Sequence, residues 1–186
     1  MKFIPTPLRG SYIVEIETIG DSRGYFARQF CQKEFEEAGL VGEFVQVNTS
    51  FSAEQGTLRG MHYQISPEEE TKLVRCLRGG AWDCILDLRQ DSETFGQWFG
   101  TEINNRNLKM MYVPKGFAHG FITLEPDTEL LYFMDSFYRP ELQRGVRWDD
   151  PNFAIQWPAE PKTISDRDRR HPEFDPSTHM VTTEAQ

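Results

Sequence analysis

Residues 72 to 89 read "KLVRCLRGGAWDCILDLR", two short apolar runs on either side of a pair of glycines. Each run has the length and the β-branched, aromatic and aliphatic content of a strand. Gly79 and Gly80 can adopt the positive φ values that tight hairpin turns need. The stretch therefore predicts two antiparallel strands joined by a hairpin.

Similar segments recur along the chain, at residues 11–20, 44–52, 109–114 and 129–138. They are short, and Gly, Pro, Asp or Asn residues separate them. This spacing is typical of an antiparallel sandwich or barrel. We therefore expect a mainly β fold.

A helix is expected at residues 32–40, where Phe35 and Leu40 are apolar, glutamates lie between them and Gly39 can end the helix. Residues 151–161 are expected to form an irregular connection. The length of 186 residues fits one domain, for which we predict residues 1–172, followed by a polar and mobile tail at residues 173–186.

The net charge of −9 argues against nucleic acid as a partner, because that affinity comes from Lys and Arg on phosphates. No apolar run reaches the roughly 18 residues of a membrane span, and Pro5 and Pro7 interrupt any signal peptide. We expect a soluble cytoplasmic protein. The three cysteines show no CxxC spacing, so neither a disulfide framework nor a zinc cluster is indicated.

His62 lies in the segment "LRGMHYQ", residues 58–64. From the residue type alone it is a metal ligand, a general base or a hydrogen-bonded core residue. The surrounding pattern resembles the cupin superfamily, because the second cupin motif, PxGxxH, is present from Pro114 to His119. The usual HxH pair of the first motif is instead His62-Tyr63-Gln64, and Lys72 stands where the motif has its Glu. An ammonium repels a divalent cation, so we expect no metal and a fixed positive charge in its place.

Cationic side chains accompany His62 at several positions, namely Arg59, Lys72 and, further away in sequence, Arg23. Lys and Arg in a dry barrel could stabilise an enolate oxygen, and a neutral His could remove a proton α to a carbonyl. Each residue also has a simpler interpretation: a lone His on a strand is often a core residue, and a strand Arg often faces solvent.

Nine separated motifs make the chain similar to the nucleotide-sugar 3,5-epimerases of deoxysugar biosynthesis, the dTDP-4-dehydrorhamnose 3,5-epimerase family. The motifs are DSRGYF (21–26), FVQVNTSFS (44–52), GTLRGMHYQ (56–64), KLVRC (72–76), TFG (94–96), VPKGFAHGF (113–121), RWDDP (147–151), IQWP (155–158) and SDRD (165–168). The resemblance implies a cupin-type jelly-roll β-barrel or sandwich with a few short helices. It also implies a cofactor-free epimerase of a nucleotide-diphosphate-linked 4-keto-6-deoxy sugar, and a homodimer that shares strands.

The resemblance implies a role for each matched residue. His62 matches the base, Asp168 the carboxylate paired with it, and Tyr132 the acid on the opposite sugar face. Lys72 and Arg59 match groups near the 4-keto oxygen. Contacts to the diphosphate and nucleotide are implied for Arg23 and Phe26, and the cleft lining is implied for Gln46, Asn48, His119 and Tyr138.

The chain departs from the family pattern at Arg28, where the motif commonly has a Glu next to the nucleotide pocket. A thymidine nucleotide is therefore the first expectation, and a CDP-, GDP- or UDP-linked sugar is the alternative. Three other functions stay open: a 3-epimerase or related ketoisomerase, a non-catalytic sugar-nucleotide-binding cupin, and a metal-dependent cupin enzyme.

Overall fold

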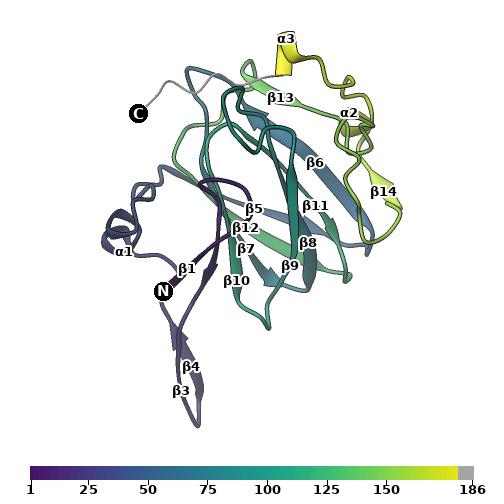
Figure 1. The fold of residues 1–186 in the computed structure, drawn as a ribbon. Helices are drawn as coiled ribbons and strands as arrows, with labels where there is room; N and C mark the ends of the chain where they lie inside the picture. The colour runs from purple at the N-terminus through teal and green to yellow at the C-terminus, as the bar shows by residue number, and fades with distance from the viewer. Residues whose placement is uncertain (180–186) are drawn as a thin grey trace.

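The computed structural model describes residues 1–179, which form two facing β-sheets, a separate hairpin and three short helices (Figure 1). Sheet I has the strand order β1 (Lys2–Pro5), β2 (Tyr12–Glu15), β10 (Lys109–Val113), β7 (Lys72–Arg78), β12 (Thr128–Met134) and β5 (Gln46–Ser52). Sheet II has the order β13 (Gln143–Gly145), β6 (Thr57–Gln64), β11 (Phe117–Thr123), β8 (Gly80–Asp87) and β9 (Trp98–Asn104). The short strand β14 (Thr163–Ile164) pairs with β6 in parallel, and the other pairs are antiparallel.

The expectation of a mainly β, cupin-type fold is confirmed by these two antiparallel sheets. The predicted irregular connection at residues 151–161 contains no helix or strand. Cys31, Cys76 and Cys84 are free thiols. Within residues 1–179 no helix has the length and apolar character needed to cross a membrane.

The predicted hairpin at Gly79 and Gly80 is wrong, because β7 and β8 lie in different sheets. β7 pairs with β10 and β12, whereas β8 pairs with β11 and β9. Gly79 does have a positive φ of 71°, as a tight turn requires, but the turn carries the chain from one sheet to the other. The inward faces of both strands are apolar, so they are buried more completely when they face each other than when they lie side by side.

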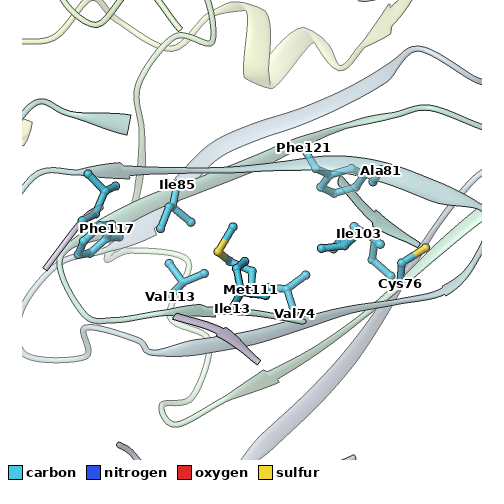
Figure 2. Close-up of a cluster of buried hydrophobic side chains, with 12 residues drawn as sticks. Ile13, Val74, Cys76, Ala81, Ile85, Ile103, Met111, Val113, Phe117 and Phe121 are labelled. Carbon is cyan, nitrogen blue, oxygen red and sulfur yellow. The ribbon is translucent and has the colours of Figure 1, made fainter. Parts of the chain in front are cut away.

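The core between the sheets explains this arrangement. Figure 2 shows side chains of sheet II, such as Ile85 and Phe121, pointing toward side chains of sheet I, such as Val74 and Met111. All four are at most 3% exposed. Burying each such side chain contributes about 1.5–3 kcal/mol, so the facing sheets supply the main driving force for the fold.

The helix predicted at residues 32–40 is present as α1 (Gln32–Glu37). Phe35 is its buried residue and packs against Phe3 and Phe44 in a second, aromatic cluster. The helix is shorter than predicted. Ala38 is its C-cap residue, and Gly39 follows with a φ of 72°, which is outside the helical range and ends the helix.

A two-stranded hairpin of β3 (Thr18–Asp21) and β4 (Gly24–Ala27) extends beyond the two sheets, at the bottom of Figure 1. Its strands expose nearly every residue, including Ile19, Tyr25 and Phe26, whose exposed fractions are 73%, 56% and 71%. An apolar hairpin of this kind is unusual on an isolated subunit, because contiguous exposed apolar surface marks interaction sites.

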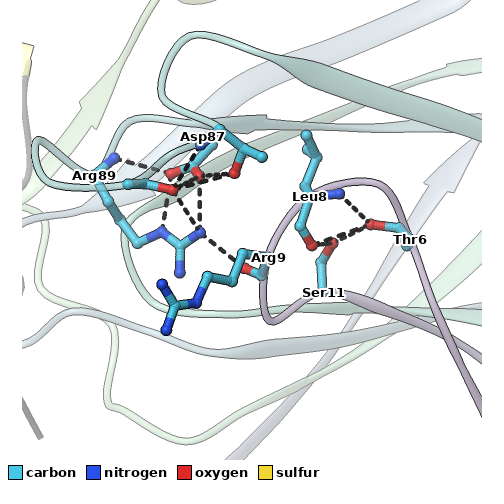
Figure 3. Close-up of polar contacts among 8 residues, drawn as sticks. Thr6, Leu8, Arg9, Ser11, Asp87 and Arg89 are labelled. Carbon is cyan, nitrogen blue, oxygen red and sulfur yellow. Dashed lines mark hydrogen bonds and ion pairs between the residues drawn. The ribbon is translucent and has the colours of Figure 1, made fainter.

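The buried carboxylate of Asp87 fixes one end of the sandwich (Figure 3). It accepts hydrogen bonds from Arg89 Nε at 2.9 Å and from the hydroxyls of Ser92 and Thr94. Arg89 also donates to the carbonyl oxygen of Arg9 at 2.8 Å and so ties the turn after β8 to the N-terminal turn. Burial alone would raise the pKa of Asp87, but these hydrogen bonds hold it below the usual value.

The C-terminal segment lies against sheet II. It contains β14, α2 (Asp166–Arg169) and α3 (Pro176–His179). Phe174, inside the predicted tail, packs on Phe153 with ring centroids 4.9 Å apart, so the segment reaches a third apolar cluster, which includes Met61 and Leu86. The domain boundary predicted at residue 172 stays a prediction, and residues 180–186 of the predicted tail lie outside the described residues.

Two glycines allow β6 and β11 to approach closely beside the segment that carries His62. Gly60 has a φ of 129°, and a Cβ added to it would lie 2.5 Å from the Cα of Gly120. The strand register also shifts between His119 and Phe121. Any side chain at residue 60 would separate the two strands.

We therefore expect Gly60→Ala to lower the free energy of unfolding by about 3 kcal/mol, through backbone strain and the clash with β11. Gly24→Ala is the matched control, since Gly24 has a similar φ of 133° but no atom within 4 Å of an added Cβ. It should cost only the strain, about 1 kcal/mol. Urea unfolding of both variants measures the difference. Equal losses in the free energy of unfolding would show that the contact between β6 and β11 does not require a glycine at residue 60.

Candidate active site

His62 and His119 form a cross-strand pair on neighbouring strands β6 and β11. Directly opposed residues of an antiparallel pair project from the same face of the sheet. Along β11, Phe117, His119 and Phe121 alternate toward sheet I, and the two phenylalanines belong to the core between the sheets. Both histidines are therefore polar groups on the inner wall of sheet II.

Asp168 reaches His62 from a distant part of the chain. The Asp168 Oδ1 atom lies 2.7 Å from His62 Nε2, and Oδ2 accepts a hydrogen bond from the backbone N–H of Gly60 at 3.2 Å. β14 places α2 beside β6 by pairing Ile164 with Leu58, and Ser165 caps α2 by accepting from the Asp168 N–H. The predicted pairing of His62 with Asp168 is thus present in the geometry.

The protonation of this pair follows from its surroundings. Burial lowers the pKa of His62 below its usual value, and this outweighs the opposite effect of Asp168. Burial would raise the pKa of Asp168, but its contacts with His171 and His62 keep the pKa far below the usual range. At neutral pH the pair is a neutral imidazole and a carboxylate. Nε2–H then donates to Asp168, and the lone pair of Nδ1 is available.

Lys72 brings a positive charge to the same region from sheet I. Its Nζ atom lies 3.5 Å from the backbone oxygen of His62 and forms a 2.8 Å ion pair with Glu70 Oε1. Both side chains of the ion pair are about nine-tenths buried. Glu70 therefore offsets part of the positive charge that Lys72 brings to this region.

Tyr132 lies on β12 of sheet I, across from the histidines. Its hydroxyl is 2.9 Å from Ser50 Oγ, and its ring centroid is 6.1 Å from that of His119. Burial raises the pKa of Tyr132, so the phenol is protonated at neutral pH. His119 Nε2 in turn lies 2.8 Å from Asp83 Oδ1, which makes a second and fully buried His–Asp pair.

The other predicted cleft residues lie near the edge strand β5. Arg59 donates to the carbonyl oxygen of Phe51 at 2.9 Å, so it bridges from β6 to β5. Asn48 is the cross-strand partner of Tyr132. Gln46 Oε1 accepts from the backbone N–H of Tyr138 at 3.2 Å, and the Tyr138 hydroxyl donates to Gln143 at 2.7 Å.

The remaining predicted contacts, Arg23, Phe26 and Arg28, lie on or next to the β3–β4 hairpin. Arg23 is 87% exposed and pairs with Asp21 on its own hairpin. Arg28 Nη1 donates to Glu34 Oε1 at 2.7 Å. In Figure 1 the hairpin extends from the end of the sandwich opposite α2, the helix that carries Asp168.

Four polar residues of this region were missed from sequence: Ser50, Glu70, Asp83 and His171. Asp83 carried a usable signal, since it occupies an inward position in the apolar strand "GAWDCILD" between Ala81 and Ile85. His171 follows a highly charged run, so nothing in the sequence suggested that its side chain is only 12% exposed.

Comparison with known proteins connects this geometry to one family. A family model described as dTDP-4-dehydrorhamnose 3,5-epimerase matches residues 5–176. A Shigella flexneri protein of that name is 40% identical over 97% of this chain and 100% of its own length. The crystal structure of the Elizabethkingia anophelis enzyme is 41% identical and has a TM-score of 0.91, covering 96% of this chain and 98% of that one. A Legionella pneumophila dTDP-6-deoxy-D-glucose-3,5-epimerase, solved in complex with dTDP-4-keto-L-rhamnose, is 36% identical with a TM-score of 0.91, covering 99% of both chains.

The lowered pKa of His62 predicts how stability depends on pH. Below the usual His value of about 6.5 the unfolded state binds a proton before the folded state does, so stability is lost as the pH falls. In His62→Gln this contribution is absent, and the free energy of unfolding should fall less steeply between about pH 6.5 and pH 5. Urea unfolding across this range provides the measurement, and identical slopes for both proteins would contradict a depressed pKa.

Proposed function

The chain belongs to the dTDP-4-dehydrorhamnose 3,5-epimerase family and is a nucleotide-sugar epimerase, and we propose that His62 is the base that starts its reaction. The observation that carries this proposal is the 2.7 Å contact between Asp168 and His62 Nε2, which leaves Nδ1 for a substrate proton. The substrate is a dTDP-linked 4-keto-6-deoxy sugar, in agreement with the dTDP-4-keto-L-rhamnose bound to the Legionella relative.

The first step is removal of a proton from the carbon next to the C4 ketone. Both C3 and C5 are α to that ketone, so one base can serve both carbons. The Nδ1 lone pair of His62 takes the proton, and the imidazolium that forms is stabilised by the Asp168 carboxylate. Asp168 also holds the ring in the tautomer that presents Nδ1 as a lone pair.

The electrons of the broken C–H bond move to the C4 oxygen as an enolate. Lys72 and Arg59 supply positive charge for that oxygen. Lys72 is buried next to the backbone of His62, where its charge acts through a lower effective dielectric than in water. Because the charge is in place before the reaction, the site needs little reorganisation as the enolate forms.

Tyr132 is the proton donor for the second step. Inversion requires that the new proton arrive on the face opposite to the base. His62 belongs to sheet II and Tyr132 to sheet I, so a sugar ring between the sheets has one on each side. The raised pKa of Tyr132 keeps its proton until the enolate takes it. Solvent then removes the proton from His62 and restores that of Tyr132.

The reaction adds and removes protons only, so it needs no redox cofactor. Neither a catalytic metal nor a nicotinamide is part of this mechanism. We place the enzyme in the cytoplasm, where its product would serve a deoxysugar or polysaccharide pathway.

The nucleotide end of the substrate is proposed to bind at a homodimer interface. Arg23 and Phe26 lie on the exposed hairpin, where a charged and an aromatic side chain suit a diphosphate and a base. Docking of this hairpin onto a second copy would cover Ile19, Tyr25 and Phe26 and complete the site of the partner. Arg28 is paired with Glu34, so its charge has a partner within its own chain and is compatible with thymidine.

Two alternatives differ from this proposal in measurable ways. An enzyme that acts only at C3 would use the same base and acid, but only the proton on C3 would exchange with solvent. A CDP-, GDP- or UDP-linked substrate would appear as tighter binding of that nucleotide than of dTDP in a direct comparison of the four.

The mechanism predicts which protons exchange with solvent. In D2O the wild type should incorporate deuterium at both C3 and C5, and His62→Asn should lose both exchange and turnover by about 10²- to 10⁴-fold. Tyr132→Phe should still exchange the proton that His62 removes but should invert poorly, because no acid serves the opposite face. NMR of the 4-keto sugar measures exchange and configuration together.

The matched control for the tyrosine is Tyr112→Phe, which removes a buried hydroxyl from the same sheet; that hydroxyl accepts from the Val41 N–H, and the ring packs in the aromatic cluster around Phe35. It should keep normal turnover. Label at C3 alone would make the chain a 3-epimerase, and unchanged turnover in His62→Asn would favour a binding module or a different base.

The dimer proposal predicts that Phe26→Ser increases the fraction of monomer and raises KM for the nucleotide sugar at least tenfold. Leu77→Ser is the control, because Leu77 is also an exposed apolar residue, at 42%, but lies outside the hairpin. Sedimentation velocity measures the oligomeric state. A Phe26→Ser protein with unchanged assembly and KM would show that the hairpin does not form the nucleotide site.

A further inference from the structure

A second histidine shares the Asp168 carboxylate with His62. His171 Nε2 lies 3.5 Å from Asp168 Oδ1, the same oxygen atom that contacts His62 Nε2. One donor atom from each of the three residues lies within 4.8 Å of the others. Two imidazoles and one carboxylate are a ligand set that divalent transition metals prefer.

The position of His171 is built into the fold. Gly145 on β13 is the cross-strand partner of His62, and a Cβ at Gly145 would lie 2.4 Å from atoms of the His171 ring. The missing side chain at residue 145 is therefore what gives His171 room beside β6. The rings of His171 and His62 meet edge to face with centroids 5.7 Å apart.

The Nε2 atom of His171 is buried, and within residues 1–179 its long 3.5 Å contact with Asp168 does not have the geometry of a hydrogen bond. A buried nitrogen without a hydrogen bond costs free energy, and such a group calls for a specific explanation. The mechanism described above makes no use of His171. A ligand that accepts electron pairs from all three residues would satisfy this atom.

We propose that His62, Asp168 and His171 bind one Zn²⁺ or a similar divalent transition-metal ion, and that this ion reversibly switches the epimerase off. Tetrahedral zinc with ligands at about 2.0–2.1 Å places neighbouring donor atoms about 3.3 Å apart. The His171–Asp168 separation of 3.5 Å is close to this value. The His62–Asp168 contact of 2.7 Å must widen by about 0.6 Å, a small side-chain movement.

This site differs from the metal site of cupins. The cupin motif would use the position of Lys72 as a ligand, and the ammonium there still opposes an ion on the inner wall. His171 instead comes from the segment after α2, on the Asp168 side of the His62 ring. Glu70 pairs with Lys72 at 2.8 Å and offsets the repulsion between the ammonium and an ion at Asp168.

The ion would inactivate the base by changing its tautomer. In the active enzyme Nε2 carries the proton and Nδ1 has the lone pair. A metal ion bound through Nε2 uses the electron pair of that nitrogen, so Nε2 gives up its proton and the neutral ring carries its one N–H on Nδ1. His62 then presents an N–H group to the sugar and cannot accept its proton. Substrate approaches the other nitrogen, so the ion lowers kcat and leaves KM unchanged.

This inhibition rests on the proposed role of His62, whereas binding of the ion does not. The first experiment therefore measures binding alone. Calorimetric titration of the chelator-treated protein with Zn²⁺ should give one site per chain, and His171→Gln should weaken it at least tenfold. Gly145→Ala should do the same, since its Cβ occupies the place of the His171 ring. Arg170→Gln is the matched control, because Arg170 is 80% exposed and pairs with Asp166.

The second experiment measures kcat and KM against free Zn²⁺, with EDTA added afterwards to restore activity. A fall in kcat that is reversed by EDTA and that needs at least tenfold more Zn²⁺ in His171→Gln supports the proposal. Absence of a stoichiometric site, or equal affinity in the wild type, His171→Gln and Gly145→Ala, overturns it.

Zinc that binds through His171 without lowering kcat overturns the inhibition. The activity of zinc-free His62→Asn separates this result from a failure of the proposed function. If this variant is inactive, the assignment of His62 as the base stands. If it is active, that assignment is wrong. Thermal unfolding of each variant confirms that it is folded, and if His171→Gln is not, Gly145→Ala and the Co²⁺ absorption spectrum of the wild type decide the outcome.

Discussion

The contact of Asp168 with β6 is the interaction on which the site depends. One carboxylate accepts from His62 and from the backbone of Gly60, and so joins α2 to the central part of sheet II. Removing either partner would leave a buried carboxylate short of hydrogen bonds, which is costly. The same contact fixes the ring orientation of His62 and the path of the C-terminal segment. One carboxylate therefore holds both the fold at this point and the side chain proposed as the base.

The two-sheet architecture brings a small set of polar residues together from both sides of the sandwich. Each sheet contributes one wall, and alternation along the strands places a polar side chain at intervals among apolar neighbours. His62 and His119 line one wall, and Tyr132 and Lys72 come from the other. Buried apolar residues of the core adjoin them, and charges in buried surroundings interact more strongly than in water.

The wrong prediction of a hairpin at Gly79 and Gly80 shows why local patterns have limits. The two glycines correctly marked a turn, and both flanking runs are strands. Turn chemistry alone does not say whether the strands on either side pair with each other or enter different sheets. That choice depends on the partners available: β10 and β12, which pair with β7, and β11, which pairs with β8, are distant in sequence.

The sequence by itself determined the β-rich composition, the strand segments, the helix near Phe35 and the motifs that place His62, Lys72, Tyr132 and Asp168 in a family. These features depend on residue type and local spacing. Only the tertiary structure decided that Asp168 meets His62, that Gly145 makes room for His171 and that the hairpin with Arg23 lies away from them. Such contacts join residues far apart in the chain, and packing of whole sheets sets their distances.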